Sequence, residues 1–356
     1  MQGVFLAAKE PGDTGQFSGK KALITGGLGF VGSNLAIRLV SSGADVHIVD
    51  CLMPGHGGNM FNIRGIEKDV EVDYSDITDT GAMNRLVKGK DFIFHLAGQN
   101  DHVLALNDPF PDLQNNVFGT AVLLEACKKN NRDAPIIYAS TRGVYGPVEK
   151  LPVSESAVPK PRGLYELTNY MAEKMFGIYR NTHSIQFVNL RLTNLFGPRS
   201  QMMHARFGVV NWFIRLALEG KEIPLFGGGG VLRDFLYVDD AVDAFLAAAS
   251  SPRAFGQTFN VASGRPVSVK EIAGKIVRLA GGGTLRQSPY TPERKQIEPG
   301  DFYANISKIG SEIGWRPATG IEEGLKKTIE YYREFSEYYW GGKHAGSGSG
   351  KKGKTD

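Results

Sequence analysis

Residues 22–32 read ALITGGLGFVG, a short apolar run followed by glycines at positions 26, 29 and 32. The apolar run predicts a buried strand, and we expect a helix to begin near Phe30. Glycines at this spacing allow a tight strand-to-helix turn, close approach of the backbone to a pyrophosphate at the helix N-terminus, and close packing of the helix. The stretch therefore predicts a dinucleotide-binding turn made by Gly26, Gly29, Phe30, Val31 and Gly32.

Carboxylates follow the next two predicted strands. Asp50 ends the second strand, where a carboxylate accepts hydrogen bonds from an adenosine ribose and repels a 2′-phosphate. The sequence therefore favours NAD over NADP. Asp76 and Ile77 follow the third strand and are expected near the adenine, although Asp76 could equally cap the next helix.

Strand and helix patterns alternate through the first half of the chain. This alternation predicts βαβ units and a parallel sheet covered on both faces. The fold class we expect is α/β: a Rossmann-type doubly wound parallel sheet with a smaller C-terminal α/β substrate lobe. The expected strands are 21–25, 46–50, 70–74, 92–96, 136–139 and 186–192, and the expected helices are 30–41, 83–86, 117–129 and 165–180.

Composition divides the chain into a core and two loose ends. We expect a loose N-terminal extension (1–18) and a flexible Gly/Ser/Lys tail (341–356). Between them we expect a NAD-binding Rossmann domain (19–192, with 233–262 returning to it) and a substrate-binding lobe (193–232 and 263–340).

The net charge of +4 lies mostly in the tail, whose four lysines and one aspartate contribute +3 and leave +1 for residues 1–340. A near-neutral body carries no nucleic-acid footprint. No apolar run approaches the roughly 18 residues of a membrane span, so we expect no membrane association. Two cysteines, Cys51 and Cys127, sit in apolar stretches that suit buried free thiols, which favours a reducing, cytoplasmic location. The histidines and cysteines lack metal-ligand spacing, and no metal is expected.

From about Lys20 to Trp340 the chain resembles the extended short-chain dehydrogenase/reductase family, in particular its nucleotide-sugar epimerases and dehydratases, of the UDP-glucose 4-epimerase kind. The resemblance implies NAD as cofactor, with Leu96, Ala97 and Gly98 beside it. The motifs that carry it are TGGLGFVG (25–32), HLAG (95–98), NNVFGT (115–120), YASTRGVYG (138–146), YELTNYMAEK (165–174), RLTNLFGP (191–198), RDFLYVDD (233–240) and GWRP (314–317).

The resemblance also implies a catalytic pair. Tyr165 matches the general base that takes the proton of the reacting sugar hydroxyl, and Thr141 matches the residue that hydrogen-bonds the same oxygen. The family lysine four residues after the tyrosine is Asn169 here, which carries no charge to lower the pKa of the phenol. A shifted register, with Tyr170 as base and Lys174 as its lysine, restores the spacing and stays open as an alternative.

Substrate contacts are carried over in the same way. Asn194 and Arg233 match positions that hold the substrate diphosphate, although Arg233 could instead pair with Asp234. Further candidates for substrate binding are Arg142, which is also a possible source of positive charge, Asp301 and His102.

Dehydratases of the resembled family use Asp-Glu directly after the threonine, where this chain has Arg142 and Gly143. The resemblance therefore implies epimerisation, at C4, by transient oxidation to a keto-sugar and re-reduction. Two alternatives stay open: a nucleotide-sugar dehydrogenase or ketoreductase, and a catalytically impaired NAD-binding scaffold or sensor. A homodimer is expected through helices 113–129 and 165–180, as a four-helix bundle. The nucleotide and the sugar stay open.

Overall fold

The computed structural model describes residues 15–204, 208–290 and 300–341. The expected N-terminal extension, apart from residues 15–18, and the expected tail, apart from Gly341, lie outside this range.

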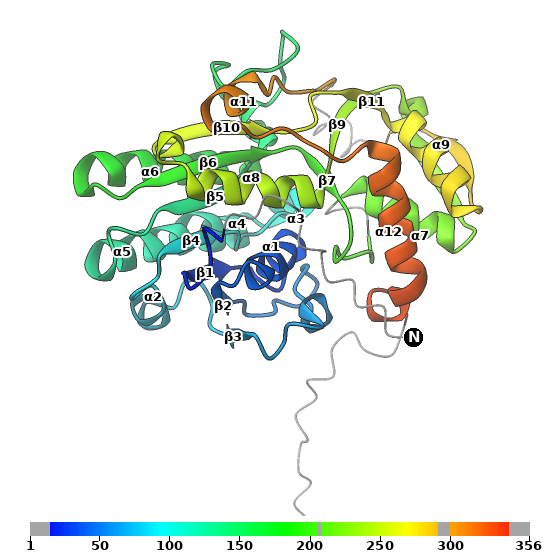
Figure 1. The fold of residues 1–356 in the computed structure, drawn as a ribbon. Coiled ribbons are helices and arrows are strands. Elements are labelled where there is room, and N and C mark those ends of the chain that lie inside the picture. Colours follow the sequence, from blue (N-terminus) through cyan, green and yellow to red (C-terminus); the bar gives the residue numbers. More distant parts are fainter. Residues whose placement is uncertain (1–14, 205–207, 291–299, 342–356) are drawn as a thin grey trace, which may run out of the picture.

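A seven-stranded parallel sheet forms the centre of the molecule (Figure 1). Its strand order is β10-β6-β5-β4-β1-β2-β3, so the chain builds outward from β1 in one direction and then in the other. The reversal between β1 and β4 creates a crevice at the carboxyl ends of the strands, where ligands of such sheets bind. The strands are β1 (Lys21–Thr25), β2 (Asp45–Val49), β3 (Val70–Asp73), β4 (Phe92–His95), β5 (Ile136–Thr141), β6 (Phe187–Leu192) and β10 (Gln257–Val261).

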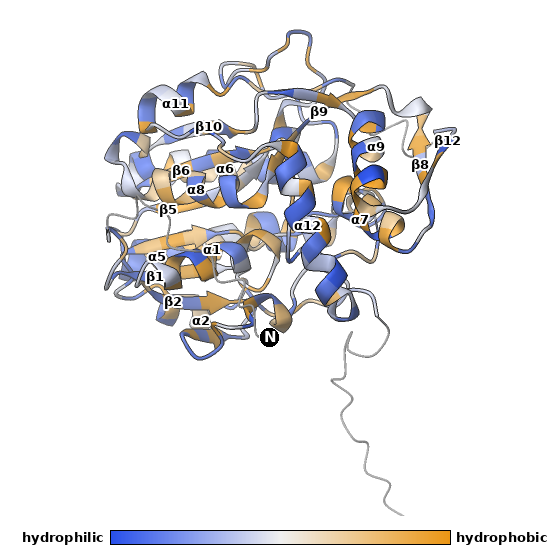
Figure 2. Cartoon of the chain, turned by 45° about the vertical axis from the view of Figure 1, so that its right-hand side comes forward, coloured by the Kyte–Doolittle hydropathy of each residue, from blue (hydrophilic) through white to orange (hydrophobic). Residues whose placement is uncertain are grey.

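Helices cover both faces of this sheet, as the alternating sequence pattern predicts. One face carries α1 (Phe30–Ser41), α8 (Val238–Ser250) and α11 (Ser307–Ile313), and the other carries α2 (Thr80–Leu86), α5 (Thr120–Asn130) and α6 (Leu164–His183). Each face has its own apolar core, and Figure 2 shows the central strands mostly in the colours of hydrophobic residues. Beside α6 lie α3 (His102–Asn107), α4 (Phe110–Asp112) and the π-helix η2 (Leu113–Gly119).

The second lobe lies beside the carboxyl edge of the sheet and has a separate apolar core. Of the segment 233–262, expected to return to the Rossmann domain, α8 and β10 lie with the central sheet, whereas β9 pairs within the lobe. The lobe contains β7 (Asn194–Phe196), β9 (Leu232–Tyr237) and β11 (Pro266–Ser268) in one sheet, β8 (Glu222–Phe226) and β12 (Thr284–Ser288) in another, and α7 (Val209–Leu218), α9 (Val269–Ala280) and α12 (Ile321–Phe335). Short 3₁₀ turns are η1 (Met60–Ile63), η3 (Arg142–Tyr145), η5 (Gly227–Gly229), η6 (Pro252–Ala254) and η7 (Ser336–Tyr338).

The two cysteines differ in exposure. Cys127 is buried in α5, as expected, but the expectation for Cys51 is wrong, because this thiol is exposed in the loop that follows β2. Among the described residues, no helix combines the length and the apolar character needed to cross a membrane.

A buried histidine joins the sheet to α5. The His95 ring lies between two hydroxyl groups, with Nδ1 2.9 Å from Thr25 Oγ1 and Nε2 3.0 Å from Thr120 Oγ1. The Thr120 hydroxyl already donates to the Asn116 carbonyl, so its oxygen accepts from Nε2 and Nδ1 accepts from Thr25. Burial lowers the pKa of His95 from 6.5 to about 3, and the ring is therefore neutral in the folded protein.

We expect His95 to make the fold acid-sensitive. Below pH 6.5 the unfolded chain binds a proton here that the folded chain excludes. The free energy of unfolding therefore decreases as the pH is lowered. The loss is about 2 kcal/mol between pH 6.5 and pH 5. In His95→Gln, urea unfolding at these two pH values should show a decrease smaller by that amount. An unchanged decrease in the variant would contradict the assignment.

Candidate active site

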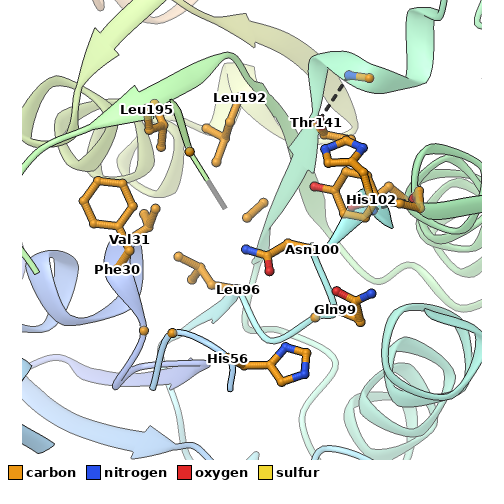
Figure 3. Close-up of a pocket in the computed structure, with 18 of the residues that line it drawn as sticks. Phe30, Val31, His56, Leu96, Gln99, Asn100, His102, Thr141, Leu192 and Leu195 are labelled. Atoms are coloured by element: carbon orange, nitrogen blue, oxygen red, sulfur yellow. Dashed lines mark hydrogen bonds between the residues drawn. The ribbon is translucent and has the colours of Figure 1, made fainter. Parts of the chain in front are cut away.

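A cavity of about 640 Å³ lies between the carboxyl ends of the central strands and the second lobe (Figure 3). Its volume falls within the range of about 300–1,000 Å³ typical of ligand pockets. Residues at the ends of β1, β2, β4, β5 and β6 line one side, and residues of β9 and the segments around it line the other. The cavity therefore occupies the crevice where the strand order reverses.

The glycine turn borders one end of the cavity. Gly26 has a φ of +71°, and its amide donates to the Val49 carbonyl at 2.7 Å. A Cβ on Gly32 would stand 2.2 Å from the Gly26 carbonyl oxygen, so the α1 backbone approaches the turn more closely than any side chain allows. The N-terminus of α1 begins after Gly29 and borders the cavity, which leaves room for a pyrophosphate against its amides.

The two expected carboxylates also line the cavity. Asp50 accepts from the amides of Leu28 at 3.0 Å and Leu52 at 2.9 Å, while its burial raises its pKa. Asp76 accepts from the amide and hydroxyl of Thr78, and α2 is capped instead by Asp79. Of the two roles considered for Asp76, capping is therefore excluded. Residues Ile77, Leu96, Ala97 and Gly98 line the same end.

Thr141 and Tyr165 both line the cavity. Thr141 ends β5, Tyr165 lies in the first turn of α6, and the nearness of the Thr141 hydroxyl lowers the pKa of the Tyr165 phenol. Burial raises the pKa of Tyr165 well above its usual range, although the Thr141 hydroxyl and the Arg142 charge lower it. The carboxylates of Glu166 and Asp112 raise it further. The Thr141 oxygen also accepts from the Gly143 amide at 3.0 Å, dashed in Figure 3.

Asn169 occupies the position of the expected lysine and is buried, with 5% of its surface exposed. Its amide nitrogen donates to the Tyr165 carbonyl at 2.8 Å, and its oxygen accepts from the Tyr138 hydroxyl at 2.9 Å. The alternative pair lies elsewhere: Lys174 stands 4.9 Å from the ring centre of Tyr170, and neither residue borders the cavity. The geometry therefore favours Tyr165.

The candidate substrate residues are not all brought together. Arg142, Asn194, Arg233 and His102 line the cavity, whereas Asp301 is exposed outside it and accepts from the Leu232 amide.

The pairing of Arg233 with Asp234 is not observed. The Arg233 guanidinium donates to the carbonyls of Leu232 and Gly300 at 2.9 and 2.6 Å. The Asp234 carboxylate accepts instead from Ser263, Gly264 and Ala304. Arg233 therefore keeps its place beside the cavity through carbonyl contacts.

Sequence reasoning missed several residues of the site. Asn116, in the π-helix η2, accepts from the Gln99 amide at 2.8 Å and donates to Thr168 at 3.1 Å. The adjacent Asn115 also borders the cavity, as does Glu166 next to Tyr165. The available signal in the sequence was the pair of adjacent asparagines, Asn115 and Asn116. The structure places them in a π-helix, a kind of turn that often marks functional sites. Within the described ranges, no group of three or more His, Cys, Asp or Glu side chains could hold a metal ion.

A buried ion pair supports the site from behind. Glu173 of α6 accepts two hydrogen bonds from Arg191 of β6, at 2.9 and 2.6 Å, and one from the Ser140 hydroxyl at 2.5 Å. Both charged side chains are buried. The Arg191 guanidinium also lies 4.7 Å from the ring centre of Tyr145. Helix α6 is thereby fixed to the two strands beside it.

Known proteins share this fold and much of the sequence. Residues 22–262 match the model of the NAD dependent epimerase/dehydratase family. A UDP-glucose 4-epimerase of Mycolicibacterium smegmatis is 32% identical over 321 residues, which cover 89% of this chain and 100% of the relative. A UDP-glucuronic acid decarboxylase 1 of Xenopus tropicalis is 32% identical over 90% of this chain and 73% of its own length. The structure of a Thermus thermophilus UDP-glucose 4-epimerase in complex with NAD superposes with a TM-score of 0.79 at 28% identity, covering 88% of this chain and 99% of that one.

The ion pair behind the site should dominate the stability of this region. Glu173→Gln leaves the Arg191 guanidinium buried without a counter-ion, which should cost about 3–5 kcal/mol in urea unfolding. The double variant Glu173→Met/Arg191→Met buries no charge and should be more stable than Glu173→Gln. A loss below about 1 kcal/mol in the single variant would contradict this.

Proposed function

This chain belongs to the NAD dependent epimerase/dehydratase family, and on that premise we propose that it is a nucleotide-sugar 4-epimerase. The sugar would be oxidised at C4 to a keto-sugar and reduced again on the opposite face. The relatives include UDP-glucose 4-epimerases and also a decarboxylase, so family membership alone does not select the reaction. Epimerisation at C4 is what we propose.

One observation carries the proposal: Thr141 and Tyr165 lie together at a cavity that begins at a glycine turn. Removing hydride from a carbinol carbon requires that its hydroxyl lose a proton, and a phenol at that oxygen can receive it. Arg142 and Gly143 follow Thr141, so this segment offers no carboxylate to assist elimination of water.

The residues at the glycine turn fit NAD. Gly26, Gly29, Phe30, Val31 and Gly32 would cradle the pyrophosphate, Asp50 would accept the adenosine ribose hydroxyls, and Asp76 and Ile77 would adjoin the adenine. Leu96, Ala97 and Gly98 would pack on the rest of the molecule. Bound NAD supplies a hydride acceptor that later returns the hydride, and its ring carries a positive charge.

Tyr165 would act as both base and acid. As a base it takes the C4 hydroxyl proton, and it returns the proton when the keto group is reduced. Thr141 would hold the same oxygen. Because Asn169 carries no charge, Arg142 would be the chain's own cation that lowers the pKa of Tyr165. Asn169 would then position Tyr165, since it donates to that residue's carbonyl.

The opposite end of the cavity would hold the nucleotide diphosphate. The Arg233 guanidinium presents several N–H donors in one plane, a geometry that suits phosphate oxygens. Asn194 adds an amide beside it, anchored to the Asp234 carbonyl at 3.0 Å. Arg142 and His102, nearer Tyr165, would contact the sugar.

We include a homodimer in the proposal. Helix α6 exposes Leu167, Met171 and Ile178 along one side, with 58% of the Ile178 side chain exposed. The neighbouring α3, α4 and η2 expose Leu106, Phe110, Leu113 and Phe118, including 73% of Phe110. Apolar side chains gathered over adjoining helices favour an interface, here with the same helices of a second copy.

The proposed reaction is tested with UDP-, GDP-, CDP- and dTDP-sugars, followed by NMR in the presence of NAD. We expect a C4 epimer of one of them and no accumulation of NADH, which is followed by its absorbance. Net NADH formation without an epimer would instead identify a dehydrogenase.

Tyr165→Phe should lower epimer formation by about 10²–10⁴-fold, the usual contribution of a general acid–base. NAD binding, measured by calorimetry, should change little. The neutral Asn169 and the nearby acids favour a rival function, an NAD-binding scaffold, in which this substitution would alter no measurable property.

Asn169→Lys should restore the missing charge beside Tyr165. A cation within about 4–6 Å of an acidic group lowers its pKa by about one to three units. The rise of kcat with pH should therefore move to lower pH. Arg142→Gln should move that rise to higher pH, and by less when it is combined with Asn169→Lys. Asn169→Gln is the neutral control. A pH profile common to the wild type and all of these variants would refute the electrostatic role.

Light scattering at micromolar concentration should show a dimer. Phe110→Glu/Ile178→Glu should convert it to a monomer, because charges would be buried in the interface. Val158→Glu is the control, since Val158 is 72% exposed and lies in the loop before α6, outside the helices concerned. A monomeric wild-type protein would remove the dimer from the proposal.

A further inference from the structure

A second ionisable pair stands beside Tyr165, and the epimerase mechanism does not use its chemistry. His102 begins α3 and Glu166 lies in α6, with His102 Nδ1 2.8 Å from Glu166 Oε1. The His102 ring meets the Tyr165 ring edge-on, with centroids 4.4 Å apart. Figure 3 shows its imidazole on the same side of the cavity as Thr141.

Two glycines make room for the Glu166 carboxylate. A Cβ on Gly143 would stand 2.6 Å from Glu166 Cγ, and a Cβ on Gly163 would stand 2.3 Å from Glu166 Oε2. Glu166 is therefore held between the segment after Thr141 and the start of α6. Burial alone would raise the pKa of Glu166, but the hydrogen bond and charge of His102 hold it below its usual value, so the carboxylate is ionised at neutral pH.

This carboxylate fixes the role of each imidazole nitrogen. An ionised carboxylate can only accept, so Nδ1 carries the proton that it donates to Glu166. When the ring holds this one proton, Nε2 has the lone pair that can take a second proton. His102 borders the cavity and its side chain is 43% exposed. A base oriented by a carboxylate, next to the residue that holds the reacting oxygen, is the arrangement expected for proton abstraction.

A keto group acidifies the C–H bonds of the carbons beside it, so the proposed keto-sugar would be a carbon acid. We propose that His102, oriented by Glu166, exchanges the proton on a carbon next to the keto carbon, C3 or C5, of a keto-nucleotide sugar. The inference rests on the proposed function for the supply of that keto-sugar.

The step balances within the site. The C–H bond breaks and its proton moves to His102 Nε2, while its electron pair forms a C=C bond to the keto carbon. The carbonyl π pair moves to oxygen, which takes the Tyr165 hydroxyl proton. In the reverse direction a proton returns to carbon, and return to the opposite face would invert that carbon as well. Glu166 is a positioning residue in this scheme.

The test supplies the keto-sugar directly. UDP-4-keto-6-deoxyglucose and its dTDP counterpart are incubated with the NAD-loaded protein in D₂O, and deuterium at C3 and C5 is followed by NMR. We expect exchange at one of these carbons at least tenfold above the enzyme-free rate. Exchange at that background rate would overturn the inference.

A parallel incubation with UDP-glucose and dTDP-glucose reports C4 epimerisation separately. Epimerisation without exchange in the keto-sugar would leave the proposed function standing and refute the role of His102. Exchange without epimerisation would refute the proposed function and keep the acid–base pair.

Variants assign the two roles. His102→Gln and Glu166→Gln should each lower the exchange rate at least tenfold, and Glu166→Gln should add little in the His102→Gln background, because a positioning residue acts through its partner. His183→Gln removes an imidazole at the far end of α6 and should exchange like the wild type. If Glu166→Gln lowered the exchange rate by the same factor in the wild type and in the His102→Gln background, the oriented pair would be contradicted.

Discussion

The buried contact between Glu173 and Arg191 is the constraint on which the candidate site depends. It joins α6 to β6, and through the Ser140 hydroxyl it joins both to β5. Tyr165 lies two helical turns before Glu173, and Thr141 directly follows Ser140, so one ionic cluster sets the position of the tyrosine against the threonine. A charge pair this deeply buried is costly to form and costlier to break, which gives the helix a single place on the sheet.

The same contact explains why the cluster does not supply the charge that Asn169 lacks. Both oxygens of Glu173 are used by Arg191, and the Arg191 guanidinium also lies over the Tyr145 ring. Its positive charge is therefore balanced behind the site. Asn169 accepts from the buried Tyr138 hydroxyl and donates to the Tyr165 carbonyl of the helix. It satisfies both groups without burying a further charge.

Local patterns in the sequence predict the central fold and much of the site. The glycine turn, the strands up to β6 and the residues that border the cavity next to Thr141 and Tyr165 follow from short motifs or from family resemblance. Features that depend on distant segments do not follow. His102 and Glu166 meet only because α3 packs against α6, and Asp301 leaves the cavity because it anchors the start of β9. Cys51 is exposed because the buried strand β2 ends at Val49, so the cysteine lies in the loop beyond it.

Charges of both signs act on the pKa of Tyr165, and they oppose one another. Arg142 favours the phenolate, whereas Glu166 and Asp112 oppose it, and burial raises the pKa of Asp112 to about 6, so this carboxyl is mostly ionised at neutral pH. Tyr165 therefore stays protonated at neutral pH while it faces only these side chains. In the proposed function, the amount of phenolate would then depend on what enters the cavity, and a cationic cofactor ring beside the phenol would supply the charge that the missing lysine would have supplied permanently. Deprotonation of Tyr165 would thereby be coupled to cofactor occupancy, and the sugar hydroxyl would lose its proton in the state in which a hydride acceptor is present.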